Sequence, residues 1–437
     1  MSRKAAILGL GNSGEAAARL LNDRGWSVTV LNSSSIVDHA KIQLLSDENI
    51  SCIIGSEADT DSSFYDLCVM SPGIDLKAPI AQNIIRKGIP LIGEVELAFR
   101  ECALPVIAIT GTNGKTTTTG LIETLLNGCG IRARACGNIG RPFSEIVLHE
   151  LSDLQVMVVE VSSFQLETIC KFRPYIALWL NLSPNHLDRY RSFKDYQKAK
   201  LRIFLNQTAE DFAVVNARAS LPPLAAKQIT FSALKNTKAD FTQRGDKIFF
   251  QGTPVLDQKT TRLHGIHNAE NLMAALAAGH CLGLEFTTMA KAIVQYSAPE
   301  HRCELVQERR GVRWINDSKS TNLDALEKAI VSQGRPLILI AGGKDKGVEF
   351  DSIADLVAKR VKTVILIGEM RKRIAASWQS MSPRVCETLD DAVSLADSLS
   401  TPGDTVLFSP GTSSYDMFSN YEDRGNRFKY LVRSLSQ

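Results

Sequence analysis

Short apolar runs that end in glycine or polar residues recur along the chain, and they predict the strands of parallel sheets. The first group lies near the N-terminus, at Ala5–Leu8, Val28–Leu31, Ile53–Ile54 and Leu67–Met70. Between the first two runs, Glu15–Arg24 has apolar residues at helical spacing, and Gly25 predicts the end of that helix. Strand-like segments that alternate with helix-like segments are typical of α/β folds.

Two further groups of the same kind follow. The second opens with the apolar strand Pro105–Thr110, and the third contains Val312–Ile315, Pro336–Ala341, Val361–Ile367 and Thr405–Phe408. At 437 residues the chain has room for about three domains of roughly 150 residues each. We therefore predict an α/β protein of three domains, with a Rossmann-like parallel sheet in residues 1–95, a central α/β domain in 96–299 and a second Rossmann-like domain in 300–437. The polar stretch Ser220–Thr261 predicts an antiparallel excursion.

Composition narrows the class of protein. Hydrophobic residues make up 44% and charged residues 22%, which is ordinary for a globular enzyme. The net charge of +3 is too small for a binder of nucleic acid that relies on basic tails. No apolar run reaches the roughly 18–20 residues of a membrane-spanning helix, so a cytosolic protein is expected. The nine cysteines include no C-x-x-C pair and suggest buried free thiols, and neither they nor the seven histidines cluster as zinc ligands would.

The first glycine-rich loop, Gly9–Gly14, has the pattern G-x-G-x-x-G directly after a strand and before a helix. In that context it predicts a diphosphate-binding turn at a helix N-terminus. A dinucleotide enzyme would also carry an acidic residue about 20 residues later, for the ribose hydroxyls. This chain has Asn32 there, followed by serines, which argues against NAD. Glycines that merely allow close packing of strand and helix remain the alternative.

The second loop, Thr110–Thr117, predicts an ATP site. Its small residues let successive N–H groups surround a triphosphate, Lys115 can reach the outer phosphates, and a threonine hydroxyl can bind Mg²⁺. It departs from the usual P-loop pattern because Ile109 stands where a glycine is expected. A helix is expected to follow at Thr118–Asn127. This loop predicts that the central domain, residues 96–299, is a P-loop-type ATPase domain.

A glutamate near the end of an apolar strand points to the metal. The run Val156–Val161 is apolar except for Glu160. Burial of a carboxylate costs folding free energy unless a cation lies beside it. Magnesium at the triphosphate loop is one such cation. An ion pair between Glu160 and a nearby lysine is the alternative.

Longer segments resemble the Mur ligases, in the shared order and over essentially the whole chain. They are Ser71–Gly73, Gly111–Thr117, Gly137–Gly140, Glu160–Glu167, Asn181–Tyr190, Ala199–Phe204, His267–Asn271, Asn316–Asn322, Ser409–Pro410, Asp416–Phe418 and Tyr421–Asn426. The resemblance implies an ATP-dependent ligase that adds D-glutamate to UDP-N-acetylmuramoyl-L-alanine through an acyl phosphate, releasing ADP and phosphate, in cytoplasmic peptidoglycan precursor synthesis. It also implies a monomer that acts on small molecules and has neither nucleic acid nor membrane as a partner.

The resemblance assigns catalytic roles to Lys115, Glu160, His186 and Lys200. One Mg²⁺ is expected near Thr116 and Glu160, and a second near His186 and Lys200, with a CO₂-derived carbamate on Lys200. Without the resemblance, Lys200 in the helical pattern Tyr196–Phe204 reads as one more solvated lysine, and His186 as a histidine that caps a loop.

Binding residues follow from the same matching. The expected ATP contacts are Gly111, Thr112, Asn113, Gly114, Lys115, Thr116, Thr117, Asn268, Asn271, Arg302, Asp317 and Lys319. The expected contacts to the other substrates are Asn12, Ser13, Asn32, Ser33, Gly73, Asn138, Ser162, Gln165, Thr321, Lys346, Ser414 and Tyr421. The last four are expected on the glutamate side, where a dicarboxylate needs a cation and hydroxyl or N–H donors. Asn185 departs from the aspartate that many D-glutamate ligases carry, which puts a role for that neighbour of the metal site in doubt.

Three rival functions would each account for part of the sequence. A sister ligase would share the ATP apparatus, but the separate N-terminal segment argues against a folylpolyglutamate enzyme, and no Asp-Asn-Pro-Arg motif follows residue 301 as a diaminopimelate-adding enzyme would require. A dehydrogenase built on Gly9–Gly14 leaves Gly111–Thr117 and Glu160 unexplained. A non-catalytic descendant is disfavoured because Lys115, Glu160 and the other expected catalytic residues are all present.

Overall fold

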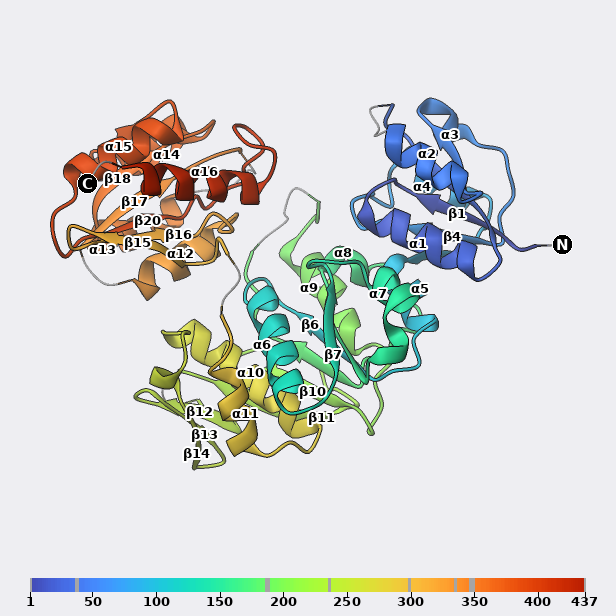
Figure 1. The fold of residues 1–437 in the computed structure, drawn as a ribbon, viewed down its shortest axis with the longest axis horizontal. Coiled ribbons are helices and arrows are strands. Elements are labelled where there is room, and N and C mark those ends of the chain that lie inside the picture. The colour runs from blue at the N-terminus through green and yellow to red at the C-terminus, as the bar shows by residue number, and fades with distance from the viewer. Residues whose placement is uncertain are drawn as a thin grey trace. The chain divides into compact units, whose positions relative to one another are not determined.

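The computed structural model describes residues 2–35, 39–184, 189–234, 237–297, 300–333, 336–345 and 350–435. These fall into two compact units, one of Met1–Leu182, Lys194–Thr261 and Ala269–Tyr296, the other of Ser183–Phe193, Arg262–Asn268 and Ser297–Gln437. The first unit holds a five-stranded and a nine-stranded sheet, and the second holds a six-stranded sheet (Figure 1). The predicted α/β fold is confirmed, whereas the domain boundaries at 95 and 299 stay predictions.

The N-terminal sheet is parallel throughout, with the order β3-β2-β1-β4-β5. Because the chain reverses its direction of winding beside β1, the carboxyl end of β1 is the place where such sheets bind ligands. Helix α1 begins at Asn12, three residues earlier than expected, and buries alanines and leucines against the sheet. The elements are β1 (Lys4–Leu8), α1 (Asn12–Asp23), β2 (Ser27–Asn32), α2 (His39–Asp47), β3 (Ser51–Ile54), α3 (Ser56–Thr60), β4 (Leu67–Met70), α4 (Pro79–Arg86) and β5 (Leu91–Gly93).

Helix α5 (Glu94–Arg100) follows β5 directly and carries two buried glutamates. Glu96 accepts hydrogen bonds from the backbone N–H groups of residues 170–172, at 2.8–3.0 Å. Glu94 accepts one from the N–H of Ser144 at 2.6 Å, in the first turn of α7 (Phe143–His149). Burial raises the pKa of Glu94 to about 7, and hydrogen bonds from Ser144 and Phe143 oppose that shift. The two carboxylates thus join α5 to loops of the larger sheet.

Glu94→Gln is expected to stabilise the protein at pH 8. Because the folded state raises the pKa of Glu94 above 4.5, the wild type loses stability as pH rises from about 4.5 through about 7. Glutamine keeps the acceptor for Ser144 and removes the charge, so the gain over the wild type should grow by about 3 kcal/mol across that range. Chemical unfolding of both proteins at several pH values measures it. Parallel curves for the two proteins would show that Glu94 does not titrate there.

The nine-stranded sheet has the order β14-β13-β12-β11-β10-β9-β6-β8-β7. From β7 through β8, β6, β9, β10 and β11 to β12, neighbouring strands of the sheet pair in parallel. Strand β13 pairs antiparallel with both β12 and β14. The predicted antiparallel excursion is therefore right for the last three strands and wrong for β11, which continues the parallel sheet beside β10. The strands are β6 (Val106–Thr110), β7 (Ala133–Gly137), β8 (Val156–Glu160), β9 (Ile176–Trp179), β10 (Phe212–Asn216), β11 (Lys227–Ser232), β12 (Phe241–Arg244), β13 (Lys247–Phe250) and β14 (Thr253–Asp257).

Helix α6 (Lys115–Gly128) leaves β6 through the glycine-rich loop and packs beside α11 (Phe286–Ile293). It begins at Lys115 rather than at Thr118, because Gly114 already serves as the N-cap. The other helices of this part are α8 (Ser163–Leu166), α9 (Phe193–Leu201) and α10 (Ile266–Cys281). The loops that follow β6, β8 and β9 meet at one edge of the parallel sheet, and the candidate site lies there.

The six-stranded sheet has the order β15-β16-β20-β17-β18-β19, with β15 antiparallel to β16 and the rest parallel. Side chains of α12, α13 and α14 share one apolar core with the sheet, and side chains of α15 and α16 share another. The elements are β15 (Glu304–Arg309), β16 (Val312–Asn316), α12 (Leu323–Ser332), β17 (Leu337–Ala341), α13 (Ala354–Arg360), β18 (Val361–Leu366), α14 (Arg371–Ser377), β19 (Arg384–Val385), α15 (Leu389–Leu399), β20 (Thr405–Phe408) and α16 (Tyr421–Ser434).

All nine cysteines are free thiols, as expected, but not all are buried. Cys170 and Cys303 are exposed because they lie in loops, so the prediction of uniformly buried thiols is wrong. Among the described helices, none has the length and apolar character needed to cross a membrane.

Candidate functional site

The loop between β6 and α6 has the form of a phosphate-binding loop. Gly114 has φ of +84°, and a Cβ there would lie 2.5 Å from the side-chain oxygen of Asn271. The Nζ of Lys115 donates to the carbonyl oxygens of Gly111 and Thr112, at 3.0 Å each. The loop thus opens the N-terminus of a 14-residue helix, which favours anions, with a lysine folded over it. Asn271, expected as an ATP contact, lies against this loop and accepts from the hydroxyl of Thr118 at 3.3 Å.

Glu160 lies at the end of β8 with 3% of its surface exposed. One carboxylate oxygen accepts from the side-chain amide of Asn138 at 3.0 Å. The other oxygen, Oε2, is buried and has no hydrogen-bond partner among the described residues, and the ion pairs of the described lysines are with other carboxylates than that of Glu160. The ion-pair alternative is therefore wrong within the described chain. A buried carboxylate oxygen without a partner is what a magnesium ligand at this loop requires.

Lys200 is buried, with 2% of its surface exposed, so its reading as a solvated lysine is wrong. Its Nζ donates to the carbonyl oxygen of Gly111 at 2.8 Å and to the hydroxyl of Thr110 at 3.3 Å. It also lies 5.0 Å from the ring centre of Tyr196. Burial and the charge of Lys115 hold the pKa of Lys200 well below its ordinary value, against the pull of Glu160. The structure thus brings three expected catalytic residues, Lys115, Glu160 and Lys200, to one edge of the sheet.

Some expected substrate contacts have structural partners of their own. Ser162 and Gln165 form a capping box at the start of α8, with the N–H of each accepted by the side chain of the other. Asn138 donates to Glu160 through its side chain and its backbone N–H. Their roles toward substrate stay predictions.

The expected uridine-nucleotide contacts share the carboxyl edge of the N-terminal sheet. Asn12 opens α1 after β1, Asn32 ends β2, and Gly73 follows β4. The side-chain oxygen of Asn32 accepts from the N–H of Leu10 at 3.2 Å, inside the glycine-rich loop. A Cβ at Gly14 would come within 2.0 Å of the carbonyl oxygen of Gly9. The glycines therefore do serve close packing, the alternative considered above, while the loop keeps the position of a phosphate-binding turn. Ser33 donates to Asp59 at 2.7 Å, and Ser13 lies in the first turn of α1.

In the second unit, Asp317 lies directly after β16 and is buried. Its carboxylate accepts from the hydroxyl of Ser409 at 2.7 Å and from the N–H of Cys303 at 3.0 Å. Burial raises the pKa of Asp317 to about 6, while the bond from Ser409 and the charge of Arg302 lower it. The Nε of Arg302 is buried without a hydrogen-bond partner among the described residues, so this guanidinium has capacity left for a phosphate.

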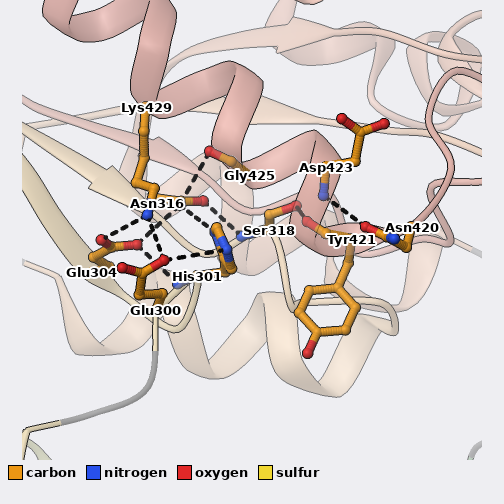
Figure 2. A network of polar contacts seen from close by, with 10 residues as sticks. All are labelled: Glu300, His301, Glu304, Asn316, Ser318, Asn420, Tyr421, Asp423, Gly425 and Lys429. Carbon is orange, nitrogen blue, oxygen red and sulfur yellow. Dashed lines mark hydrogen bonds and ion pairs between the residues drawn. The ribbon is translucent and has the colours of Figure 1, made fainter.

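The expected ligand residue Tyr421 belongs to a polar network that sequence reasoning missed (Figure 2), and the backbone of Lys319 contacts the same network. At its centre, His301 has φ of +65°, and its Nδ1 lies 2.9 Å from the Nδ2 of Asn316. The backbone carbonyl of His301 accepts from the N–H of Lys319 at 3.0 Å, and its ring meets the ring of Tyr421 edge-on at 6.2 Å. Burial and Lys429 lower the pKa of His301, although Glu304 and Glu300 oppose them. The backbone N–H of Lys319 and the ring of Tyr421 thus contact a histidine whose charged form burial disfavours.

Arg424 on α16 is a second residue that sequence reasoning missed. With 1% of its surface exposed, it donates to the hydroxyl and the carbonyl of Ser318, at 3.0 and 2.8 Å, and to the carbonyls of Thr412 and Ser413, both at 3.1 Å. These acceptors lie in the loops after β16 and β20, which carry Lys319, Thr321 and Ser414. Only its place in the segment Tyr421–Asn426 could have drawn attention to it.

Two expected site residues, His186 and Lys346, lie outside the described residues, as does Asn185. Asn268 donates to the carbonyl oxygen of His264 at 3.0 Å and belongs to the second unit. Within the described parts of the chain, no three His, Cys, Asp or Glu side chains form a metal-binding cluster. A magnesium site with one carboxylate, one hydroxyl and phosphate oxygens does not need such a cluster.

Comparison with known proteins decides the family. Residues 3–93 match the N-terminal domain of MurD-like Mur ligases, 109–279 the Mur ligase middle domain, and 301–411 the Mur ligase glutamate ligase domain. UDP-N-acetylmuramoylalanine--D-glutamate ligase from Geotalea uraniireducens is 40% identical over 449 residues, which cover 100% of this chain and 98% of the relative. The chain belongs to the Mur ligase family. The enzyme of the same name from Koribacter versatilis is equally similar, with 40% identity and the same coverage.

Solved structures of other Mur ligases share the fold of this one. UDP-N-acetylmuramate-alanine ligase MurC from Thermotoga maritima superimposes with a TM-score of 0.63 at 18% identity, covering 99% of this Mur ligase and 100% of that chain. The MurF ligase from the same organism, solved with ADP, gives 0.62 at 13% identity, covering 100% and 96%. At such identities the likeness concerns the fold alone.

Proposed function

We propose that this Mur ligase joins D-glutamate to UDP-N-acetylmuramoyl-L-alanine and cleaves ATP to ADP and phosphate, as a cytoplasmic monomer that supplies a peptidoglycan precursor. Relatives that carry this activity in their names match the whole chain at 40% identity. One structural observation carries the chemistry: Lys115, Lys200 and the carboxylate of Glu160 are gathered around one phosphate-binding loop. That arrangement suits an ATP-dependent ligase and has no use in a dehydrogenase.

The reaction brings two anions together, so the protein must neutralise charge and fix geometry. A carboxylate oxygen of the substrate attacks the γ-phosphorus, and the bond to the ADP oxygen breaks. The amine of glutamate then attacks the acyl carbon, phosphate leaves, and the amine loses a proton. In our proposal the N-terminus of α6 and the ammonium of Lys115 oppose the charge of the phosphates.

The residues present fit Mg²⁺. The buried Oε2 of Glu160, which has no partner among the described residues, and the hydroxyl of Thr116 would hold one ion, which adds positive charge beside the phosphate oxygens. We further propose a second ion near His186 and Lys200, with Lys200 converted to a carbamate by CO₂. A carbamate would turn a buried cation into an anion that can bind metal. Among the described residues, Lys200 has the neutral oxygens of Thr110 and Gly111 as hydrogen-bond partners and no carboxylate as an ion-pair partner.

The two remaining substrates would use the other two sheets. We assign the uridine nucleotide to the carboxyl edge of the N-terminal sheet, at Asn12, Ser13, Asn32, Ser33 and Gly73. We assign contacts with the ribose and phosphates of ATP to Asp317, Arg302 and Lys319. We assign glutamate to Lys346 and to the loops that carry Thr321, Ser414 and Tyr421.

A phosphate-release assay tests the proposal. With UDP-N-acetylmuramoyl-L-alanine, ATP and Mg²⁺, the wild type should release phosphate with D-glutamate and not with L-glutamate, L-alanine, L-lysine or diaminopimelate. Lys115→Ala should release at least 10²-fold less, because it lacks the charge over the phosphate loop. Release with another amino acid would identify a sister ligase, and no release with any amino acid would refute a ligase function.

A further inference from the structure

The side chain of Asn181, two residues beyond β9, makes a pair of hydrogen bonds with the triphosphate loop. The N–H of Asn113 donates to Oδ1 of Asn181 at 2.9 Å, and Nδ2 of Asn181 donates to the carbonyl oxygen of Asn113, also at 2.9 Å. The side-chain amide therefore meets both polar groups of one backbone residue in the centre of the loop.

The backbone beside Asn181 extends this contact. The N–H of Leu180 donates to the carbonyl of Thr110 at 3.0 Å, and the N–H of Thr112 donates to the carbonyl of Asn181 at 3.1 Å. The pairing of β6 with β9 thus continues past the end of both strands, and the amide of Asn181 adds the last rung. A Cβ on Gly111 would lie 3.0 Å from that of Leu180, so the two segments run in close contact.

The carbonyl groups that this contact orients also bind the two lysines of the site. Gly111 offers its carbonyl to Lys115 and Lys200, and Thr112 offers its carbonyl to Lys115. If the loop rotates, these acceptors and the N–H groups that face the phosphates rotate with it. A loop that must be ordered when nucleotide binds pays about 1–2 kcal/mol of backbone entropy per residue, which a preformed loop avoids.

We propose that Asn181 is a positioning residue that holds the triphosphate loop in its nucleotide-binding form. It acts through Asn113 and not by contact with the reacting atoms. The proposal deepens the function proposed above and rests on it for the identity of the nucleotide. An amide is required because it donates and accepts at once: aspartate would turn a second acceptor toward the carbonyl of Asn113, and alanine would leave both groups of Asn113 without this partner.

Asn127 offers a matched control at the other end of α6. Its side chain makes the same reciprocal pair with one backbone residue, accepting from the N–H of Ala133 and donating to its carbonyl, both at 3.1 Å. Loss of either asparagine removes the same kind of hydrogen bonds, but Asn127 has no contact with the triphosphate loop. Effects on general stability should therefore appear in both variants, and effects on the loop in one.

The test measures binding of Mg-ADP by calorimetry and steady-state kinetics for the wild type, Asn181→Ala, Asn181→Asp and Asn127→Ala. We expect Asn181→Ala to lower the affinity for Mg-ADP and to raise the KM for ATP, each by about tenfold. This factor is the equivalent of one or two lost hydrogen bonds. Asn181→Asp should bind ADP more weakly than Asn181→Ala does. In both variants the affinity for UDP-N-acetylmuramoyl-L-alanine, measured without nucleotide, should equal that of the wild type. Asn127→Ala should bind ADP as the wild type does.

Equal ADP affinity in Asn181→Ala and the wild type, or an equal loss in Asn127→Ala, would overturn the proposal. Asn181→Asp is nearly isosteric, so it gives a second reading if the alanine variant fails to fold. The ADP measurement needs no amino acid. A wild type that binds ADP but shows no D-glutamate-dependent turnover would refute the proposed function and leave the role of Asn181 to be judged on its own.

Discussion

Lys200→Ala is expected to lower kcat by about 10²–10³-fold, with a smaller effect on the KM for ATP. The side chain lies fully buried between the triphosphate loop and Tyr196, and its nitrogen is 2.8 Å from the carbonyl of Gly111. Loss of a preorganised charged group beside the reacting phosphate costs roughly that factor. If Lys200 acts as a carbamate, short carboxylic acids should partly restore the activity of the alanine variant, because a free carboxylate can occupy the vacated space.

The same helix provides the control for that experiment. Lys198 is exposed two residues earlier, so Lys198→Ala should keep wild-type turnover. Careful removal of bicarbonate and CO₂ should lower the activity of the wild type and leave that of Lys200→Ala unchanged. Wild-type turnover in Lys200→Ala would exclude a catalytic role for this lysine. If carboxylic acids failed to rescue the variant and the wild type did not depend on CO₂, the carbamate would be excluded, but a catalytic role for the unmodified lysine would remain.

Sequence reasoning located the strands well because each is a short apolar run that ends in glycine or a polar residue. Thr405–Phe408 and Leu67–Met70 match the structure residue for residue. Helix starts were less accurate: α6 begins at Lys115 because Gly114, in the left-handed region, caps it, and a string of threonines gives no apolar period to mark the first turn. Strand direction failed at β11, since polar composition suggests a surface hairpin and says nothing of pairing partners.

The site was predictable where local sequence determines geometry. The phosphate loop and Glu160 were each recognisable from neighbours in sequence, and the pairing of β6 with β8 brings them together. Burial of Lys200 was not predictable from its helix, because contacts with residues about 90 positions earlier create it. Asn181 and Arg424 were missed for the same reason: their importance lies in which distant backbone groups they bind, and no spacing within the sequence records that.

Three buried charged side chains, Asp317, Glu94 and Arg424, form hydrogen bonds with neutral partners among the described residues. Asp317 binds a hydroxyl and an N–H group, Glu94 an N–H group, and Arg424 carbonyls and a hydroxyl. Burial shifts the pKa of all three groups toward the neutral form, although nearby opposite charges, such as that of Arg302 near Asp317, oppose the shift for Asp317 and Arg424. Charges of this kind stabilise loops at a cost in folding free energy, as expected where loops serve a binding site.

Arg424→Ala is expected to lower the free energy of unfolding of the C-terminal unit by about 3 kcal/mol or more, and to raise the KM for glutamate. The guanidinium is almost fully buried, and its removal leaves the carbonyls of Ser318, Thr412 and Ser413 without this donor. Each buried polar group left unpaired costs about 1–3 kcal/mol. Burial already lowers the pKa of Arg424 to about 10, so the charge itself is held at a cost that these bonds offset.

The measurement combines calorimetric unfolding with kinetics at saturating ATP and varied glutamate. Arg424→Lys should recover little, because an ammonium cannot match the fork that meets both loops at once. Arg427 follows on the same helix, α16, and is exposed. Arg427→Ala should change the free energy of unfolding by no more than about 0.5 kcal/mol. If Arg424→Ala lost stability but kept the KM for glutamate, the arginine would be a fold residue alone. If the free energy of unfolding fell and the KM for glutamate rose together, the result would support a glutamate site formed by the loops after β16 and β20, which Arg424 joins.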